Sequence, residues 1–144
     1  MTTLTMPATH GLDHVGLSVR NLADTVRFFQ DALGWRLVGE RPDYPAAFVS
    51  DGRATLSLWQ VADPGRAAAF DRRANVGLHH LALAVAEEHG LEDLHARLAA
   101  WPGVTVEFAP QPVRAGPKRH FIVLEPGGLR LEFAHDPRDW ITAL

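Results

Sequence analysis

Residues 12–19 read LDHVGLSV and residues 78–85 read LHHLALAV, so that Leu, His, Leu and Val recur in the same order 66 positions later. In both stretches apolar residues alternate with small or polar ones, and this period of two is typical of a half-buried β-strand. The repeated strand predicts a chain made of two similar modules, each beginning with this strand.

A helix is expected after each of these strands. The first begins after Asn21, a good N-cap residue, and ends at Gly34. The second carries Leu91, Leu94 and Leu98 at helical spacing. Further strands are predicted at 35–40, 46–51, 54–61, 104–109, 119–125 and 129–134, and a short closing helix at 136–144. Each module is therefore βαβββ, and the fold class is α+β.

The chain length of 144 residues fits one domain. Within this domain, residues 12–61 form the first module, residues 62–77 a linker and residues 78–134 the second module. The linker is long enough for the two modules to pair within one chain or between two chains.

The composition excludes several classes of function. The formal charge of −3 carries no basic patch, which argues against nucleic acid as a partner. No apolar run is long enough to cross a membrane, and no secretory signal is visible. The absence of cysteine removes disulfides and thiolate sites and suits a reducing compartment. The expected location is cytoplasmic and the expected partner a small molecule.

Three potential metal ligands fall on one face of the predicted strands. Side chains two residues apart share a face, so the aliphatic residues can pack on the helices and leave His14, His80 and Glu132 on the other side. Two imidazoles and a carboxylate suit Fe(II), Zn(II), Mn(II) or Ni(II). Taken singly, each is more often a solvated residue. By the same alternation His79 points away from His80 and is a packing or surface residue.

Four other residues are candidates for the site. His120 could be a catalytic acid or base, or a solvated histidine at a strand end. Ser57 and Trp59 share one face and could line a pocket, although Trp59 could instead be a core residue. Arg130 could hold an anionic substrate or pair with Glu132.

The segments LDHVGLSV, LHHLALAV and EPGGLRLEF resemble the glyoxalase / bleomycin-resistance / dioxygenase superfamily, also called vicinal oxygen chelate, and the resemblance extends over residues 12–134. It implies paired modules whose mainly antiparallel sheets curl around a metal site, often with two chains contributing. His14, His80 and Glu132 match the ligands of the first, fifth and last strands. The resemblance thus implies one divalent metal per site, with Fe(II) favoured, and a homodimer.

The sequence departs from particular branches of this family. Ser57 stands where proteins similar to glyoxalase I carry a ligating glutamate, so the remaining set resembles extradiol dioxygenases and fosfomycin-modifying transferases. Those two groups carry a tyrosine where this chain has Ile122. Methylmalonyl-CoA epimerases share the His79-His80 pair but use a glutamine near position 57, and Gln60 lies on the wrong face for that role.

The expected function is therefore a metal-dependent enzyme whose small substrate chelates the metal through vicinal oxygens, with extradiol-type dioxygenase chemistry favoured. Three alternatives within the enzyme class are glyoxalase or lyase, epimerase and fosfomycin-type transferase chemistry. A fourth alternative is a metal-free protein that sequesters a ligand, as bleomycin-resistance proteins do. Intact metal ligands favour an enzyme, because a pure binding groove does not need them.

Overall fold

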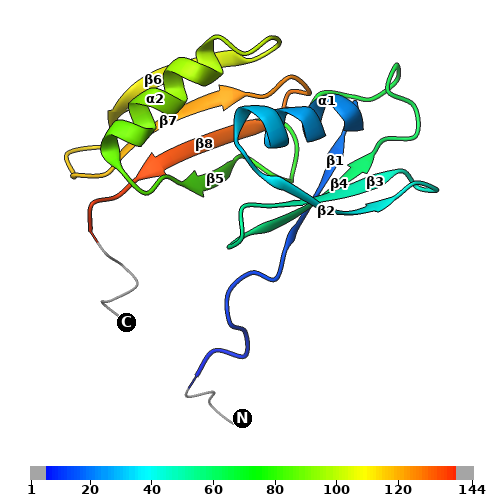
Figure 1. Ribbon diagram of the computed structural model, residues 1–144, viewed down its shortest axis with the longest axis horizontal. Coiled ribbons are helices and arrows are strands. Elements are labelled where there is room, and N and C mark those ends of the chain that lie inside the picture. Colours follow the sequence, from blue (N-terminus) through cyan, green and yellow to red (C-terminus); the bar gives the residue numbers. More distant parts are fainter. Residues whose placement is uncertain (1–5, 139–144) are drawn as a thin grey trace.

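The computed structural model describes residues 6–138 and contains two four-stranded sheets, each with one helical segment (Figure 1). The first module comprises β1 (Val15–Val19), α1 (Leu22–Arg27), the π-helical segment η1 (Phe28–Ala32), β2 (Arg36–Arg41), β3 (Ala46–Ser50) and β4 (Thr55–Gln60). The second module comprises β5 (Leu81–Ala84), α2 (Glu88–Ala99), β6 (Thr105–Pro112), β7 (Arg119–Leu124) and β8 (Arg130–His135). This order confirms the expected pair of βαβββ modules.

The two sheets have the same topology. Their strand orders are β1-β4-β3-β2 and β5-β8-β7-β6. In each sheet the first strand pairs in parallel with the last, and the other pairings are antiparallel. The first strand of each module, β1 or β5, is therefore an edge strand within the described chain.

The repeated strands begin later than the sequence pattern indicates. Strand β1 begins at Val15 and strand β5 at Leu81, so His14 and His80 lie in the residues that lead into the strands. Residues 62–77, predicted as the linker, contain turns but no helix or strand. The predicted closing helix at 136–144 falls mostly outside the described residues.

The start of α1 is fixed by two side chains. The Asn21 side chain accepts a hydrogen bond from the Asp24 amide at 3.1 Å, which confirms its predicted role as N-cap. The Gln60 side-chain oxygen accepts one from the Leu22 amide at 2.7 Å, and its amide donates to the Arg20 carbonyl at 2.6 Å. Gln60 therefore ties β4 to the helix start and is turned away from the candidate site, as expected.

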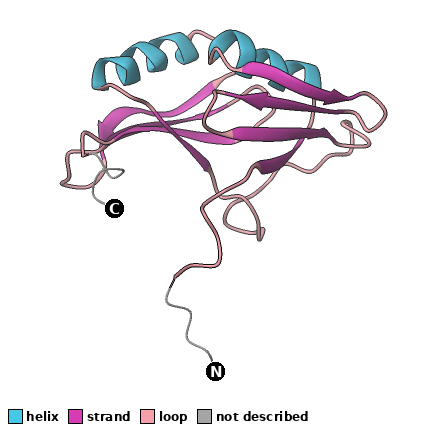
Figure 2. Ribbon diagram, turned by 60° about the horizontal axis from the view of Figure 1, so that its bottom comes forward, coloured by secondary structure: helices cyan, strands magenta, loops and turns pink. Residues whose placement is uncertain are grey.

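Both helices lie on the same side of the two sheets (Figure 2). The core lies between the helices and the sheets and is contributed by both modules. Its largest fully buried side chains include Phe28, Phe29, Phe121, Leu56, Leu58, Leu91, Leu98 and Leu131. No described helix covers the opposite face of the sheets, which is where the predicted site residues were expected.

The two modules are joined inside this core by a buried polar contact. The Thr25 hydroxyl on α1 donates to Oε2 of Glu125 at 3.1 Å, and the Leu129 amide donates to Oε1 at 3.0 Å. Thr25 and Glu125 are both buried. A Cβ at Gly127 would approach Oε1 of Glu125 to 2.6 Å, so any other residue at this position in the turn before β8 would push the carboxylate away from these contacts.

Among the described residues, no helix is long and apolar enough to cross a membrane.

Candidate functional site

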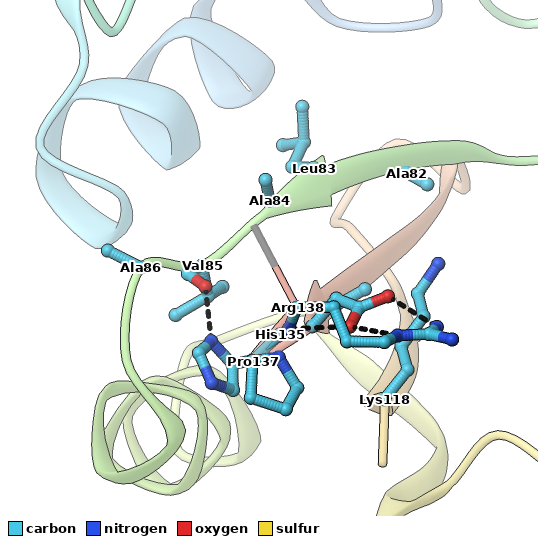
Figure 3. A pocket seen from close by; sticks show the side chains of 11 residues that line it. Ala82, Leu83, Ala84, Val85, Ala86, Lys118, His135, Pro137 and Arg138 are labelled. Atoms are coloured by element: carbon cyan, nitrogen blue, oxygen red, sulfur yellow. Dashed lines mark hydrogen bonds and ion pairs between the residues drawn. The ribbon is translucent and has the colours of Figure 1, made fainter. Parts of the chain in front are cut away.

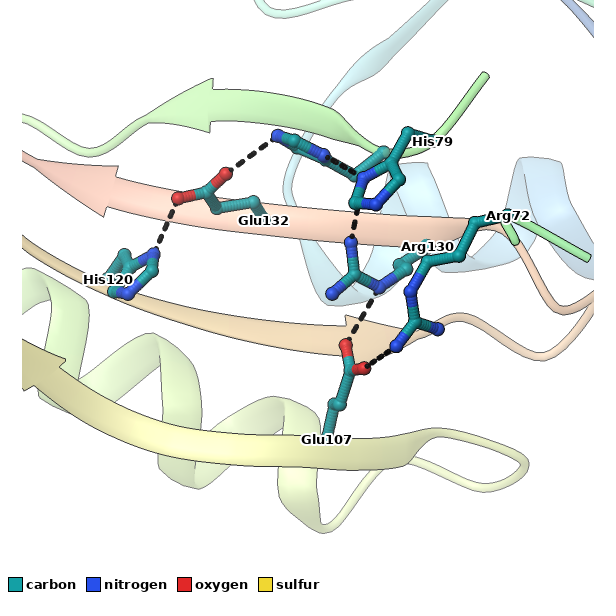
Figure 4. A network of polar contacts seen from close by, with 7 residues as sticks. Arg72, His79, Glu107, His120, Arg130 and Glu132 are labelled. Atoms are coloured by element: carbon teal, nitrogen blue, oxygen red, sulfur yellow. Dashed lines mark hydrogen bonds and ion pairs between the residues drawn. The ribbon is translucent and has the colours of Figure 1, made fainter. Parts of the chain in front are cut away.

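The carboxylate of Glu132 lies between two imidazoles on the helix-free face of the second sheet (Figure 4). Its Oε2 is 3.0 Å from Nε2 of His80, and its Oε1 is 2.6 Å from Nδ1 of His120. The Glu132 side chain is 12% exposed, whereas that of His80 is 36% exposed. A largely buried carboxylate thus meets a partly open imidazole, so an ion or small molecule can reach the contact from solvent.

The sheet register brings these three residues together. Ala82 on β5 and Ile122 on β7 are both opposite Glu132 on β8, and partners across strands share a face. His120 lies two residues before Ile122, so its side chain is on the same face. His80 is in the segment that leads into β5. The structure therefore groups His80, His120 and Glu132, two of the predicted ligands and the predicted catalytic histidine.

A second set of contacts corrects the expectation for His79. Its Nδ1 lies 2.8 Å from Nδ1 of His80 and 3.2 Å from a guanidinium nitrogen of Arg130. The prediction that His79 points away from His80 was wrong, because strand alternation does not extend to residues that precede Leu81. His79 instead connects His80 with Arg130.

One arrangement of protons on the two rings leaves Nε2 of His80 facing Glu132 without a proton. A guanidinium can only donate hydrogen bonds, so in this arrangement Nδ1 of His79 is the acceptor beside Arg130. Nδ1 of His80, 2.8 Å from that same atom, then carries the proton of the shared contact. A neutral His80 therefore presents the lone pair of Nε2 to the Glu132 carboxylate, and only a second proton or a metal cation can make this contact favourable.

The spacing of this pair fits a metal ion. In octahedral coordination, bonds of roughly 2.1 Å place two neighbouring ligand atoms about 3.0 Å apart. Nε2 of His80 is 3.0 Å from Oε2 of Glu132, a separation that an ordinary hydrogen bond also has. A metal-binding histidine usually donates its other ring N–H, as His80 does to His79, and a metal-binding carboxylate is usually hydrogen-bonded, as Glu132 is to His120. His80 and Glu132 are therefore suitable as two ligands of one metal.

His14 does not join this group within the chain. It precedes β1 in the first sheet, its side chain is 54% exposed, and its Nδ1 lies 2.6 Å from Asp13. Among residues 6–138, no three His, Cys, Asp or Glu side chains are placed to hold one metal ion. The predicted three-ligand set is thus divided between the two sheets.

The helix-free face of the first sheet carries Ser57 and Trp59. The indole N–H of Trp59 donates to the Ser57 hydroxyl at 2.9 Å, and the Trp59 ring contacts Tyr44 and Phe48 edge to face. Gly16 lies opposite Ser57 on β1, where a Cβ would approach the Ser57 hydroxyl to 3.2 Å. Trp59 is therefore part of an aromatic surface on this face rather than of the core. Its role in a pocket wall stays a prediction.

Arg130 pairs with Glu107, a residue that no sequence pattern indicated. Nε of Arg130 lies 2.8 Å from one Glu107 oxygen, and the guanidinium of Arg72 in the linker lies 3.1 Å from the other. The suggested pairing with Glu132 is not present, because both Glu132 oxygens face imidazoles. Desolvation, followed by the nearby positive charge of Arg130, lowers the pKa of His79. Alternation along β6 could have placed Glu107 on a face, but nothing in the sequence pointed to Arg72.

A cleft of about 590 Å³ lies at the end of β5 and β8 (Figure 3). It is lined by Ala82, Leu83, Ala84, Val85, Ala86, Lys118, Ala134, His135, Asp136, Pro137 and Arg138. Ala82 is the strand partner of Glu132, but His80, His120 and Glu132 are not among the residues that line the cleft.

Comparisons with known proteins agree with this architecture. The model of the Glyoxalase/Bleomycin resistance protein/Dioxygenase superfamily matches residues 11–133. A glyoxylase/bleomycin resistance protein/dioxygenase domain from Frankia sp. EAN1pec has a similar structure, with a TM-score of 0.75 and 25% identity over 92% of this chain and 96% of that chain. A comparison with curated proteins gives no significant match.

Two solved structures with lower identity share the fold. Lactoylglutathione lyase from Agrobacterium tumefaciens has a TM-score of 0.68 and 20% identity, over 90% of this chain and 96% of that chain. The fosfomycin resistance protein FosX from Listeria monocytogenes has a TM-score of 0.69 and 18% identity, over 89% and 94%. These two similarities show a shared fold and nothing more, because proteins with this fold catalyse several different reactions.

Proposed function

The chain belongs to the glyoxalase/bleomycin resistance protein/dioxygenase superfamily, and from this premise we propose that it is a metal-dependent enzyme acting on a small molecule with two neighbouring oxygens. The observation that supports this proposal most directly is the contact between Nε2 of His80 and Oε2 of Glu132. Both atoms present lone pairs to each other when His80 is neutral, and a divalent cation between them would satisfy both.

The third ligand in this proposal is His14 from a second copy of the chain. β1 and β5 are edge strands, and each has one side without a partner strand in the described chain. His14 leads into β1, and His80 leads into β5. Placing β1 of one copy beside β5 of the other, with the starts of the two strands at the same end, would bring His14 close to His80 and Glu132. A homodimer with two such sites follows from the two-fold symmetry.

The metal would act as a Lewis acid on the chelated oxygens of the substrate, and with Fe(II), the favoured ion, it would also serve dioxygen chemistry. Zn(II), Mn(II) and Ni(II) fit the same ligands. His120 orients the Glu132 carboxylate through Nδ1, so a role in proton transfer would fall to its Nε2. Ser57 and Trp59 of the sheet that supplies His14 would form the opposite wall.

Metal analysis of the full-length protein, purified without chelator, tests the proposal. We expect about one divalent ion per chain and a loss of most of it in His14→Ala, His80→Ala and Glu132→Ala. His89→Ala is the matched control, because His89 is exposed and pairs with Glu87 away from this cluster. If the three variants bind as much metal as the control, the ligand assignment is wrong.

A second candidate function is ligand sequestration without metal. The observation that favours it is that His14 is apart from His80 and Glu132 in the described chain, so that no three-residue metal group is present there. A protein of this kind would contain no stoichiometric metal and would bind its ligand equally well after treatment with a chelator.

A further inference from the structure

Two arginines converge on one carboxylate beside the candidate metal ligands. Arg130 is two residues before Glu132 on β8, so the two side chains share a face. Arg72 reaches the same place from the linker, and both guanidinium groups contact Glu107, at 2.8 Å and 3.1 Å (Figure 4). The linker, the sheet edge and the metal-ligand strand therefore meet at a single charged cluster.

Within the group of Arg72, Arg130 and Glu107, the positive charges exceed the negative one, and the neighbouring Glu132 carboxylate faces His80 and His120 instead. Both arginines are protonated at any ordinary pH, and Glu107 supplies one negative charge against their two. Arg130 is only 15% exposed and Glu107 28% exposed, whereas Arg72 is 38% exposed. The excess charge is thus partly shielded from water. In such a partly buried place, the attraction between a positive charge and an anion is stronger than at an open surface.

We propose that Arg72 and Arg130 form a subsite for an oxyanion group of the substrate, a carboxylate or a phosphoryl group, next to the metal ligands. This inference rests on the proposed function and adds the chemical class of the substrate. A guanidinium group matches the spacing of two oxygens on either kind of anion, which is why arginine recognises both. The substrate would then carry its chelating oxygens at the metal and its anionic group at the arginines.

Glu107 has a defined part in this subsite. It aligns both guanidinium groups and competes with the bound anion for them. Removing its charge raises the local excess from one positive charge to two, so Glu107→Gln should bind an anion more tightly. A purely structural role, in which Arg72 pins the linker to β6, predicts instead that Glu107→Gln and Arg72→Gln both lower stability and leave anion binding unchanged.

The test uses inorganic phosphate as the probe and metal-free, full-length protein in low salt. Isothermal titration should show saturable binding to the unmodified chain. Arg72→Gln should weaken it about tenfold or more, since charge-assisted hydrogen bonds are lost, and Glu107→Gln should strengthen it. Arg73→Gln is the matched control, because Arg73 is an exposed arginine one residue further along the linker. If acetate displaces the phosphate, the anionic group of the substrate is assigned as a carboxylate. If acetate does not displace it, the group is assigned as a phosphoryl group.

Two outcomes would overturn the inference: phosphate that does not bind saturably, or equal weakening by Arg72→Gln and Arg73→Gln. Metal content separates this failure from failure of the proposed function. Arg72 is not a candidate ligand, so Arg72→Gln should bind metal as the unmodified protein does. If His80→Ala loses its metal but no variant binds phosphate, the proposed metal site is supported and only the anion subsite is contradicted.

Discussion

The hydroxyl of Thr25 donates a hydrogen bond to the carboxylate of Glu125 at 3.1 Å, across 100 residues of sequence and between the two modules. Both side chains are buried, so the carboxylate oxygen loses this donor without gaining water when the hydroxyl is removed. We expect Thr25→Val to lower the free energy of unfolding by about 1–3 kcal/mol. Thr25→Ser, which keeps the hydroxyl, should lose clearly less. Urea denaturation followed by circular dichroism measures both, and equal losses would contradict the role of the hydrogen bond.

The division of the ligands between the sheets predicts complementation between defective chains. Consider a dimer of one His14→Ala chain and one His80→Ala chain whose two sites are each shared between the chains. One site would contain both histidines, and the other site would lack both. Co-expression with two affinity tags, followed by tandem purification, should therefore yield about half of the normal metal content. Each single-variant homodimer should contain little metal. A mixed dimer that is equally empty would show that each site lies within one chain.

The contact between His79 and His80 predicts that His79 influences metal affinity without binding the metal. His79→Phe removes the acceptor for the His80 N–H, and we expect the metal affinity to fall roughly 10- to 100-fold. His79→Asn offers a side-chain oxygen near the same position and should retain more of the affinity. Competition with a coloured chelator gives both values. Unchanged affinity in His79→Phe would mean that the orientation of His80 does not depend on this neighbour.

The serine at position 57 predicts poor glyoxalase I activity. That isomerisation needs a carboxylate to move the substrate proton, and a serine hydroxyl is neither a good base nor a good metal ligand at neutral pH. Its oxygen also accepts the Trp59 N–H, which holds it in place. Apo-protein loaded with Ni(II) or Zn(II) should show little turnover of the methylglyoxal–glutathione adduct. Strong turnover would refute the argument from Ser57.

For the Fe(II) form we expect ring cleavage of catechols in the presence of oxygen. Ile122 cannot take the place of the tyrosine found in extradiol dioxygenases, so His120, on the same face of β7, would move the proton. His120→Ala should then lose ring cleavage while keeping at least part of its iron. Spectrophotometry of the cleavage product and iron analysis of the same sample test the two statements separately. Cleavage that survives in His120→Ala would rule out this role.

The sequence predicted the modules well because both periodicities were strong, yet it placed the starts of the repeated strands β1 and β5 too early. Alternation in LHHLALAV continues through His79 and His80, but pairing with β8 begins only at Leu81. A residue outside the paired part of a strand points where its own contacts direct it. This is why the predicted orientation of His79 was wrong. Glu132 and His120 were placed correctly because they lie within β8 and β7. Arg72 was not foreseeable, since a linker has no periodicity that could aim it at Glu107.

The π-helical segment η1 has a consequence for how the family can vary in length. Its five residues end at Ala32, and the turn after it closes at Gly34, where φ is +73°. A π-helical segment contains one residue more than the α-helical turn it replaces, so deleting one residue from η1 would restore an α-helix and turn the helix before it by about 100° relative to β2. Phe28 and Phe29, both buried here, would then face the core at different angles. Homologues that are one residue shorter here should carry a regular α-helix and a differently distributed pair of aromatic residues, which makes this segment a natural marker for dividing the family into lineages.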